Sequence, residues 1–341
     1  MPVSPSLALS MMRALGEKVA GVCGEARLVI GFAETATAIG AVVAETISKD
    51  CIYVQTTREA LPGASVEFLE EHSHAPEQRL TAEHFQQWLE HTDTVTFVDD
   101  EISTGKTLTN IIAQLSEDFP VLREKKVVAA SILNRLSTAD EDRLQTTGII
   151  SVCLVKLVNH DYTALIENFD TREAVSAQYN ESCLYERYIV SMKHDPRLGI
   201  VSGEYMLELE HLAIQLIRQL QLDLSVDTLV LGTEECMLPG LILGKALEDK
   251  GTKTYFHATT RSPISICTEK EYPITSGWEI NSLYDISGSR RNFVYNLRAY
   301  PQVIILSDTV LPEEERIQCL IGVLKECGCG RIIYVGRQIN V

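Results

Sequence analysis

The stretch that decides the fold is Val95-Thr96-Phe97-Val98-Asp99-Asp100-Glu101-Ile102-Ser103-Thr104-Gly105-Lys106-Thr107. A β-branched apolar run leads into two adjacent acids, a loop of small residues follows, and a helical pattern covers Leu108–Ser116. Open α/β sheets bind their ligands at the carboxyl ends of the strands. The order of these features therefore predicts a ligand site at the end of a buried strand.

The loop from Ser103 to Thr107 predicts a phosphate site, because successive backbone N–H groups and the positive end of a helix together bind a phosphate dianion. Gly105 lets the backbone approach closely, and the hydroxyls of Thr104 and Thr107 add donors. Gly105-Lys106-Thr107 also matches the end of a Walker A loop, but that motif needs glycine where Asp100 stands. We interpret the stretch as a ribose site between acids and a phosphate loop; the alternative is an acidic strand end before an ordinary helix cap.

The rest of the first half alternates short apolar runs with helical patterns, which is typical of a mostly parallel sheet with flanking helices. The expected strands are Arg27–Ile30, Cys51–Gln55, Thr94–Val98, Lys126–Leu133 and Gly148–Val158. The expected helices are Ala38–Ser48, one capped by Thr81 and running through Glu90, and Leu108–Ser116.

With 341 residues, the chain is long enough for two domains. Periodicity fades between Asn159 and Gly203, so we place a boundary near residue 190, giving domains 1–190 and 191–341. The second half then repeats the α/β pattern with expected helices and strands at Glu204–Leu220, Thr228–Leu231, Leu241–Lys250, Thr254–His257, Gln302–Leu306, Glu313–Glu326 and Arg331–Val335.

Three pairs of similar segments occur in the same order in both halves, which suggests that the halves are diverged duplicates. A strand before Gly31 is echoed before Gly232, Thr56-Thr57-Arg58 is echoed by Thr259-Thr260-Arg261, and the strand into Asp99 is echoed by the strand into Asp308. We expect a second, related α/β domain in which these residues superpose.

Composition bounds the function classes. The net charge of −17 disfavours nucleic-acid binding, because a phosphate backbone would be repelled. No apolar run is long enough to span a membrane, the N-terminus lacks the pattern of a signal peptide, and nine scattered cysteines suit reduced thiols, so we expect a cytoplasmic protein. Cys327-Gly328-Cys329 is interpreted as a turn before a strand rather than a soft-metal site, and we assign no metal ligands.

The acid pair and loop resemble the motif of the type I phosphoribosyltransferases, although Thr96 lies inside the apolar strand and Glu101 replaces the usual apolar residue. With Gly31–Thr37, Thr56-Thr57-Arg58 and Thr260-Arg261-Ser262-Pro263, the chain resembles the orotate-phosphoribosyltransferase-like family joined to a C-terminal TRSP domain. That family occurs in bacterial tellurite-resistance and stress gene neighbourhoods, with a proposed role in making a nucleoside-like metabolite.

The resemblance implies roles for residues of the first half. Asp99 and Asp100 would face the ribose 2′ and 3′ hydroxyls of phosphoribosyl pyrophosphate, and Ser103, Thr104, Gly105, Lys106 and Thr107 would hold its 5′-phosphate.

It also implies a pyrophosphate loop at Phe32, Ala33, Glu34 and Thr35, where small residues offer amides to an anion. Glu34 is unusual there, since a carboxylate repels an anion; it binds Mg²⁺ or an amine, or only caps the helix. Arg58 is the candidate partner of pyrophosphate, with an ordinary surface arginine as the alternative.

Glu70–Ala75 falls where these enzymes keep a mobile loop. We expect His72 or His74 to protonate or orient the departing pyrophosphate, with a solvated polar loop as the alternative.

The second half lacks an acid pair before a Thr-Gly loop, so we expect no standard phosphoribosyl site there. An anion site of its own is predicted from Gly232, Thr233, Glu234, Thr260, Arg261 and Ser262, against the alternative of a purely structural, dimer-forming half.

These features predict an enzyme of nucleotide metabolism: a phosphoribosyltransferase that uses Mg²⁺ bound with phosphoribosyl pyrophosphate and transfers the phosphoribosyl group to a nitrogenous base. The product would be a nucleotide- or nucleoside-like metabolite. The alternative is a regulatory protein that senses phosphoribosyl pyrophosphate or a nucleotide without turnover. The expected partners are small molecules and, as an open possibility, a second copy of the chain; neither nucleic acid nor a membrane is expected.

Overall fold

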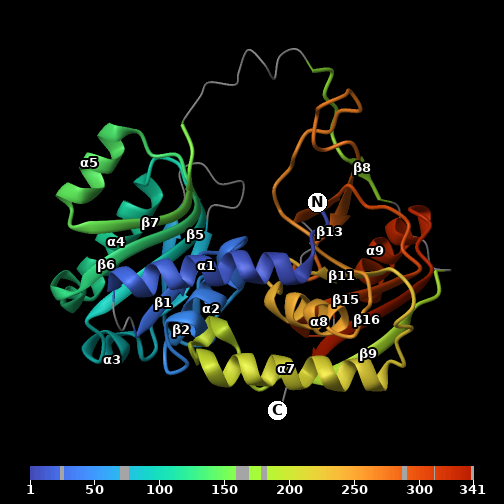
Figure 1. Ribbon diagram of the computed structural model, residues 1–341, viewed down its shortest axis with the longest axis horizontal. Helices are drawn as coiled ribbons and strands as arrows, with labels where there is room; N and C mark the ends of the chain where they lie inside the picture. The colour runs from blue at the N-terminus through green and yellow to red at the C-terminus, as the bar shows by residue number, and fades with distance from the viewer. Residues whose placement is uncertain are drawn as a thin grey trace. The chain divides into compact units, whose positions relative to one another are not determined.

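The computed structural model describes residues 1–23, 27–69, 77–158, 169–177, 183–285, 290–310 and 312–338 (Figure 1). The chain forms two compact units, and neither is a single continuous segment. The N-terminal unit consists of Leu9–His160 with His194–Glu208, and the C-terminal unit consists of Met1–Ala8, Asp161–Lys193 and Leu209–Val341.

The N-terminal unit is built on a six-stranded sheet in the order β10-β2-β1-β5-β6-β7. Its five longer strands run parallel, and β10 pairs antiparallel with β2 at one edge. The bounds are β1 Leu28–Gly31, β2 Ile52–Gln55, β5 Thr94–Ile102, β6 Lys126–Asn134, β7 Ile149–Lys156 and β10 Ile200–Val201. All four residues of β1 are buried, as expected for a parallel strand covered on both faces.

Helices cover this sheet, and a two-stranded hairpin lies beside it. The helices are α1 Pro5–Cys23, α2 Ala36–Ile47, α3 Phe85–Glu90, α4 Lys106–Asp118 and α5 Thr138–Thr146, with 3-10 turns η1 Pro120–Glu124 and η2 Pro196–Leu198. The antiparallel hairpin is formed by β3 Ser65–Leu69 and β4 Glu77–Thr81. One buried apolar cluster joins the sheet, α3, α4 and the hairpin.

The C-terminal unit has a five-stranded parallel sheet in the order β12-β11-β15-β16-β9. A three-stranded sheet in the order β14-β13-β8 accompanies it. The strands are β8 Val175–Ser176, β9 Glu186–Ser191, β11 Thr228–Gly232, β12 Thr254–Ala258, β13 Gly277–Asn281, β14 Arg291–Tyr295, β15 Gln302–Val310 and β16 Arg331–Gln338. The helices are α8 Leu238–Glu248, α9 Glu314–Glu326 and the larger part of α7 Ser202–Gln219, whose residues through Glu208 belong to the N-terminal unit.

The two sheets share their central strand order. In the N-terminal unit, β1 lies between β2 and β5, and β6 follows; in the C-terminal unit, β11 lies between β12 and β15, and β16 follows. The register also agrees, because Gly31 pairs with Gln55 and Val98 while Gly232 pairs with Ala258 and Leu306. The expected second α/β domain is therefore present, with the same parallel core.

The loops after these strands agree bond by bond. Thr56 N–H donates to Gly31 O at 2.9 Å, and Thr259 N–H donates to Gly232 O at 3.0 Å. Antiparallel bridges join Thr57 to Arg79 and Thr260 to Phe293 at equivalent places. Correspondence at the level of single hydrogen bonds supports duplication rather than chance similarity of two α/β folds.

One expected equivalence is shifted by a residue. Since Gly31 pairs with Val98 and Gly232 with Leu306, the residue equivalent to Asp308 is Asp100, not Asp99. The residue equivalent to Asp99 is a serine, Ser307. The C-terminal unit thus keeps only the second acid of the pair.

Two expected elements differ in the structure. Thr81 does not cap a helix: it ends β4, and α3 begins only at Phe85. Its backbone pairs with Ser65 across the hairpin, and that ladder outcompetes the local capping preference. The strand expected to end at Val98 continues to Ile102, because β6 pairs with it as far as Asn134.

The boundary expected near residue 190 stays a prediction, but the compact units follow strand pairing rather than a single cut. β9 pairs with β16 in the C-terminal unit, whereas β10 pairs with β2 in the N-terminal unit. Val3 forms an antiparallel bridge with Phe256 beside β12, so the first residues belong to the C-terminal unit.

Candidate functional site

Three strand ends meet at one edge of the N-terminal sheet. β2, β1 and β5 are neighbours, and Gly31 at the end of β1 is in register with Gln55 and Val98. The segments that leave these ends are 32–35, 56–58 and the acid-bearing end of β5. All three carry residues that the sequence singled out, and adjacent parallel strands bring them to the same edge.

The two acids are the sixth and seventh of the nine residues of β5. Asp99 pairs with Ser131 of β6, so its backbone is fixed by the ladder rather than placed in a loop. Both Asp99 and Asp100 are half-buried, and Asp100 N–H donates to the carboxylate of Asp99 at 2.9 Å. Glu101, which departs from the family pattern, forms an ion pair with Arg135 at 3.1 Å. The strand thus presents partly exposed carboxylate oxygens at fixed positions.

The phosphate loop leads directly into α4. Gly105 is its N-terminal cap residue, with φ of 69°, in the left-handed region that glycine adopts without strain. Ser103, Thr104, Lys106 and Thr107 are exposed. α4 has no acidic residue in its first turn, so the positive helix end is not neutralised locally.

Residues of α5 contact this loop at Thr104 and Gly105. Arg143 donates to the carbonyl of Thr104 at 2.6 Å, and a Cβ at Gly105 would lie 3.2 Å from Leu144. The helix was not predicted from the sequence because its residues are mostly polar and give little apolar periodicity.

The loop between β1 and α2 is held by hydrogen bonds to three other segments, which are β5, β4 and the residues after β2. Phe32 N–H donates to Val98 O at 3.0 Å, and Ala33 N–H donates to the Thr56 hydroxyl at 2.8 Å. Gln78 of β4 donates to Ala33 O at 3.0 Å and accepts from Thr56 at 2.5 Å. The peptide bond between Ala33 and Glu34 is cis. Gln78 gave no signal in the sequence, since its role follows from the hairpin.

Glu34 faces Arg58 rather than standing alone. Their charged groups lie 3.9 Å apart, with side chains 7% and 12% exposed. This pairing accounts for a carboxylate in a loop expected to bind an anion. Thr35 is exposed at the N-terminal cap position of α2. His72 and His74 lie outside the described residues.

The C-terminal unit has a corresponding arrangement with different charges. Glu234 N–H donates to the hydroxyl of Thr259 at 3.0 Å, as Ala33 does to Thr56. Arg261 donates from both Nε and Nη2 to one Glu234 oxygen, each at 2.9 Å, and Ser282 donates to the other oxygen at 2.6 Å. Both members of this ion pair are buried.

The remaining predicted residues of this unit lie in the same region. Thr233 bonds to Leu306 O and to the hydroxyl of Tyr284, and Tyr284 donates to Asp308 at 2.5 Å. Ser262 is exposed, and its N–H donates to the Thr260 hydroxyl at 3.2 Å.

The helix that follows β15 differs sharply from α4. α9 begins with Glu313, Glu314 and Glu315, where α4 has Gly105 and Lys106. An anion at this helix end would meet carboxylates. The anion site predicted for this unit stays a prediction, and neither the paired Arg261 nor the acidic helix end favours it.

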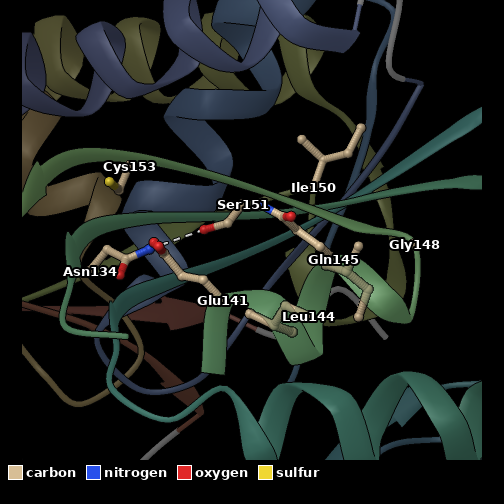
Figure 2. A pocket seen from close by; sticks show the side chains of 9 residues that line it. Asn134, Glu141, Leu144, Gln145, Gly148, Ile150, Ser151 and Cys153 are labelled. Atoms are coloured by element: carbon tan, nitrogen blue, oxygen red, sulfur yellow. Dashed lines mark hydrogen bonds between the residues drawn. The ribbon is translucent and has the colours of Figure 1, made fainter. Parts of the chain in front are cut away.

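A pocket of about 390 Å³ lies between α5 and β7 of the N-terminal unit (Figure 2). Figure 2 shows Asn134 bonded to Ser151 at 3.1 Å on one wall and Glu141, Leu144 and Gln145 of α5 on the other. β7 stands two strands away from β5 in the sheet, so this pocket is separate from the meeting strand ends.

All nine cysteines are free thiols. Burial raises the pKa of Cys51 to about 12, so that thiol stays protonated and unreactive. Cys327 and Cys329 flank Gly328, whose φ of 82° makes the turn between α9 and β16. In the part of the chain that the structure describes, no helix has the length and apolar character needed to cross a membrane.

Comparison with solved structures finds similar chains that include phosphoribosyltransferases. Adenine phosphoribosyl transferase from Trypanosoma brucei, solved with AMP, pyrophosphate and ribose-5-phosphate, has 16% identity and a TM-score of 0.34, over 42% of this chain and 64% of that one. The Giardia lamblia enzyme with 9-deazaadenine has 19% identity and a TM-score of 0.33, over 45% and 85%. Orotate phosphoribosyltransferase from Aeropyrum pernix has 18% identity and a TM-score of 0.27, over 44% and 69%.

No curated protein matches the sequence. Family models match most of it: a phosphoribosyl transferase family covers residues 1–160, and the TRSP domain, described as C-terminal to that family, covers residues 196–324. Residues 1–160 therefore belong to the phosphoribosyl transferase family, and residues 196–324 form the TRSP domain that is found C-terminal to it.

Proposed function

We propose that the N-terminal unit transfers the phosphoribosyl group of phosphoribosyl pyrophosphate to a nitrogenous base, giving a nucleotide- or nucleoside-like product. The observation that carries the proposal is the end of β5, where two half-buried acids lead into Gly105 and the open N-terminus of α4. This stretch lies inside the part of the chain that matches the phosphoribosyl transferase family.

In this proposal Asp99 and Asp100 accept hydrogen bonds from the ribose 2′ and 3′ hydroxyls. The exposed Ser103, Thr104, Lys106 and Thr107 surround the 5′-phosphate, and the N–H groups at the start of α4 donate to it. Fixing both ends of the ribose holds C1 in one position, and such positioning is a large part of catalysis for a reaction between two bound substrates.

Pyrophosphate leaves from C1 as the base nitrogen attacks the opposite face. Loop residues Phe32–Thr35 and Arg58 would hold the departing anion, whose negative charge grows in the transition state. Arg58 already faces Glu34, so the arriving pyrophosphate would compete with that carboxylate for the guanidinium. His72 and His74, which lie outside the described residues, remain candidates to protonate or orient the departing pyrophosphate.

Mg²⁺ is expected to arrive with the substrate. The ion prefers hard oxygens and is usually held by one or two carboxylates together with substrate phosphates, so Asp99 and Asp100 fit it. When bound, it would neutralise charge on the pyrophosphate. We propose a cytoplasmic location because nine free thiols suit a reducing compartment.

Pyrophosphate release tests the proposal. The full chain is incubated with phosphoribosyl pyrophosphate, Mg²⁺ and a panel of bases, and product is followed for each. Pyrophosphate release that depends on a base supports a transferase. Tight binding of phosphoribosyl pyrophosphate without release of pyrophosphate would instead support a sensor of this compound.

Asp100→Asn tests the site assignment. The substitution keeps the size of the side chain but removes the negative charge of the carboxylate that would accept hydrogen bonds from the ribose hydroxyls. We expect phosphoribosyl pyrophosphate to bind roughly 10- to 100-fold more weakly, the range for loss of a hydrogen bond to a charged group. Asp118→Asn, at the exposed end of α4, is the matched control and should bind as the wild type does. Equal affinities of the two variants in calorimetry would reject the site.

A further inference from the structure

A segment outside the matched phosphoribosyl transferase residues contacts Thr57, beside the proposed pyrophosphate ligand Arg58. His194–Glu208 belongs to the N-terminal unit, although the transferase model ends at residue 160 and the TRSP model begins at residue 196. The inference concerns this segment, and it rests on the proposed function of the N-terminal unit.

Several contacts fix the segment in place. The side chain of Asp195 accepts from the N–H of Arg197 and so caps η2. Two residues later, Gly199 has φ of 82°, and a Cβ there would lie 2.1 Å from the ring of Trp88. β10 then pairs with β2, and Ser202 donates to Ser48 O at 2.9 Å. The segment is thus tied to the unit on both sides of Arg197.

Arg197 is buried, with 7% of its surface exposed. Its Nε donates to the hydroxyl of Thr57 at 3.3 Å, and its Nη1 lies 3.5 Å from the carboxylate of Asp195. Thr57 itself is fully buried. A buried guanidinium is costly to desolvate, so a position that keeps one against Thr57 carries a specific role.

Thr57 lies between the two residues that build the pyrophosphate side of the site. Its neighbour Thr56 binds Ala33 N–H, and its other neighbour Arg58 faces Glu34. Thr57 also forms a backbone bridge with Arg79. Arg197 thus contacts, at the Thr57 hydroxyl, the segment that carries Arg58.

The C-terminal unit supplies an internal comparison. Thr260 is equivalent to Thr57, and each hydroxyl accepts from the N–H two residues later, that of Glu59 at 3.0 Å and that of Ser262 at 3.2 Å. Among the described residues, no arginine bonds to the Thr260 hydroxyl, and Arg261 is instead held by Glu234. The buried arginine that contacts this threonine is thus specific to the unit with the acid pair and the phosphate loop.

We propose that Arg197 is a positioning residue for pyrophosphate: it holds Thr57, and through it the backbone that presents Arg58 to the departing anion. The segment matched by the TRSP model thereby completes the phosphoribosyl transferase site. Arg197 is expected to influence the pyrophosphate side of the site and not the ribose 5-phosphate side, which β5 and α4 build independently.

The test compares two ligands on the full chain. Inorganic pyrophosphate and ribose 5-phosphate, each with Mg²⁺, are titrated by calorimetry into the wild type, Arg197→Ala, Arg197→Lys, Thr57→Val and the double variant Arg197→Ala/Thr57→Val. Arg123→Ala, at an exposed position in η1, is the control for loss of one positive charge. Thermal unfolding of every variant is measured alongside.

We expect Arg197→Ala to bind pyrophosphate about tenfold more weakly, with ribose 5-phosphate affinity unchanged. Thr57→Val should show the same selective loss, the double variant should lose no more than either single one, and Arg197→Lys should recover part of the affinity. A merely structural role would lower stability and the bound fraction for both ligands together, and that result overturns the proposal. So does unchanged pyrophosphate affinity or an additive double variant.

The proposed function fails separately. If the wild type binds neither ligand, both the transferase site and the role of Arg197 are rejected. If the wild type binds both ligands and the variants do too with equal affinity, only the role of Arg197 is rejected.

Discussion

Arg58 and Arg261 hold equivalent positions, and each faces a glutamate, although Glu234 is equivalent to Ala33 rather than to Glu34. Arg261 makes two 2.9 Å contacts with Glu234 in a buried setting, whereas Arg58 lies 3.9 Å from Glu34. The first arrangement neutralises the guanidinium; the second leaves it able to exchange partners. At the scale of single residues, the same pair of side chains thus serves stability in one unit and, we propose, binding in the other.

This difference predicts unequal stability losses. Arg261→Ala leaves the carboxylate of Glu234 buried beside Ser282 alone, and breaking a buried pair from one side costs about 3–5 kcal/mol. Arg58→Ala removes a pair whose charged groups lie 3.9 Å apart, although both side chains are also largely buried, so we expect a smaller loss than for Arg261→Ala. Urea unfolding of both variants measures the two losses. Equal losses of stability would contradict the predicted difference between the two ion pairs.

His257 makes the stability of the C-terminal unit depend on pH. Burial lowers its pKa from 6.5 to about 4, with a smaller effect of the positive N-terminus, and its Nε2 lies 2.7 Å from Tyr295 O. Between these pH values the unfolded chain binds a proton that the folded chain does not. The free energy of unfolding is therefore highest above pH 6.5 and decreases as the pH drops toward 4. Below pH 4 it changes no further, and the total loss is up to about 3 kcal/mol.

Urea unfolding of the wild type and His257→Gln at pH 7.5 and 5 measures this effect. The variant has no group that titrates there, so its stability should change less between the two pH values. A wild type and variant with the same pH dependence would contradict the prediction.

At the scale of elements, α5 connects the phosphate loop with the pocket beside β7. Arg143 on this helix donates to Thr104 O, and Leu144 packs against Gly105 while also lining the pocket. Removing the Arg143 contact should loosen the loop without touching the phosphate.

Arg143→Ala is accordingly expected to weaken ribose 5-phosphate binding about three- to tenfold, the effect of one hydrogen bond. Calorimetry measures it, and Arg123→Ala serves again as the charge control. If the affinity of Arg143→Ala matches that of the control, the helix does not support the loop.

The sequence predicted those elements whose signal is local. β1, β5, β6, β11 and β15 each contain a short run of mostly apolar residues, and Gly105 marks the start of α4. β9 and β10 could not be predicted, because short strands at sheet edges are defined by distant partners, here β16 and β2.

The candidate site shows the same limit. Asp99, Asp100 and the loop were found because they are contiguous in sequence. Gln78 and Arg197 contact the same loops from segments about 20 and 140 residues away, and nothing near them in sequence signals it. Arg58 and Glu34 were both found, but their pairing follows only from the structure.

At the scale of the whole molecule, each unit includes a segment that is separated in sequence from the rest of that unit. The N-terminal residues bond to β12 and α8: Val3 exchanges two 2.8 Å hydrogen bonds with Phe256, and Ser4 and Ser6 donate to Glu248. Removing Met1–Ser4 should therefore destabilise the C-terminal unit, although the deletion lies at the other end of the chain.

We expect a loss of about 2–3 kcal/mol from three or more hydrogen bonds. Hydrogen exchange followed by mass spectrometry locates it: faster exchange in β12 with unchanged exchange in β1 and β5 is the expected pattern. Exchange that rises equally in both units would contradict it.

Because each unit is built from segments that are distant in sequence, parts of it lack their partners while the chain is being synthesised. Val3 has no partner until Phe256 leaves the ribosome about 250 residues later, which is roughly 13–50 s of synthesis at bacterial or eukaryotic rates. β2 likewise has one open edge until Ile200 and Val201 arrive. During that interval the nascent chain carries an unpaired N-terminal segment and an unprotected sheet edge, so this protein is a candidate for chaperone capture during translation.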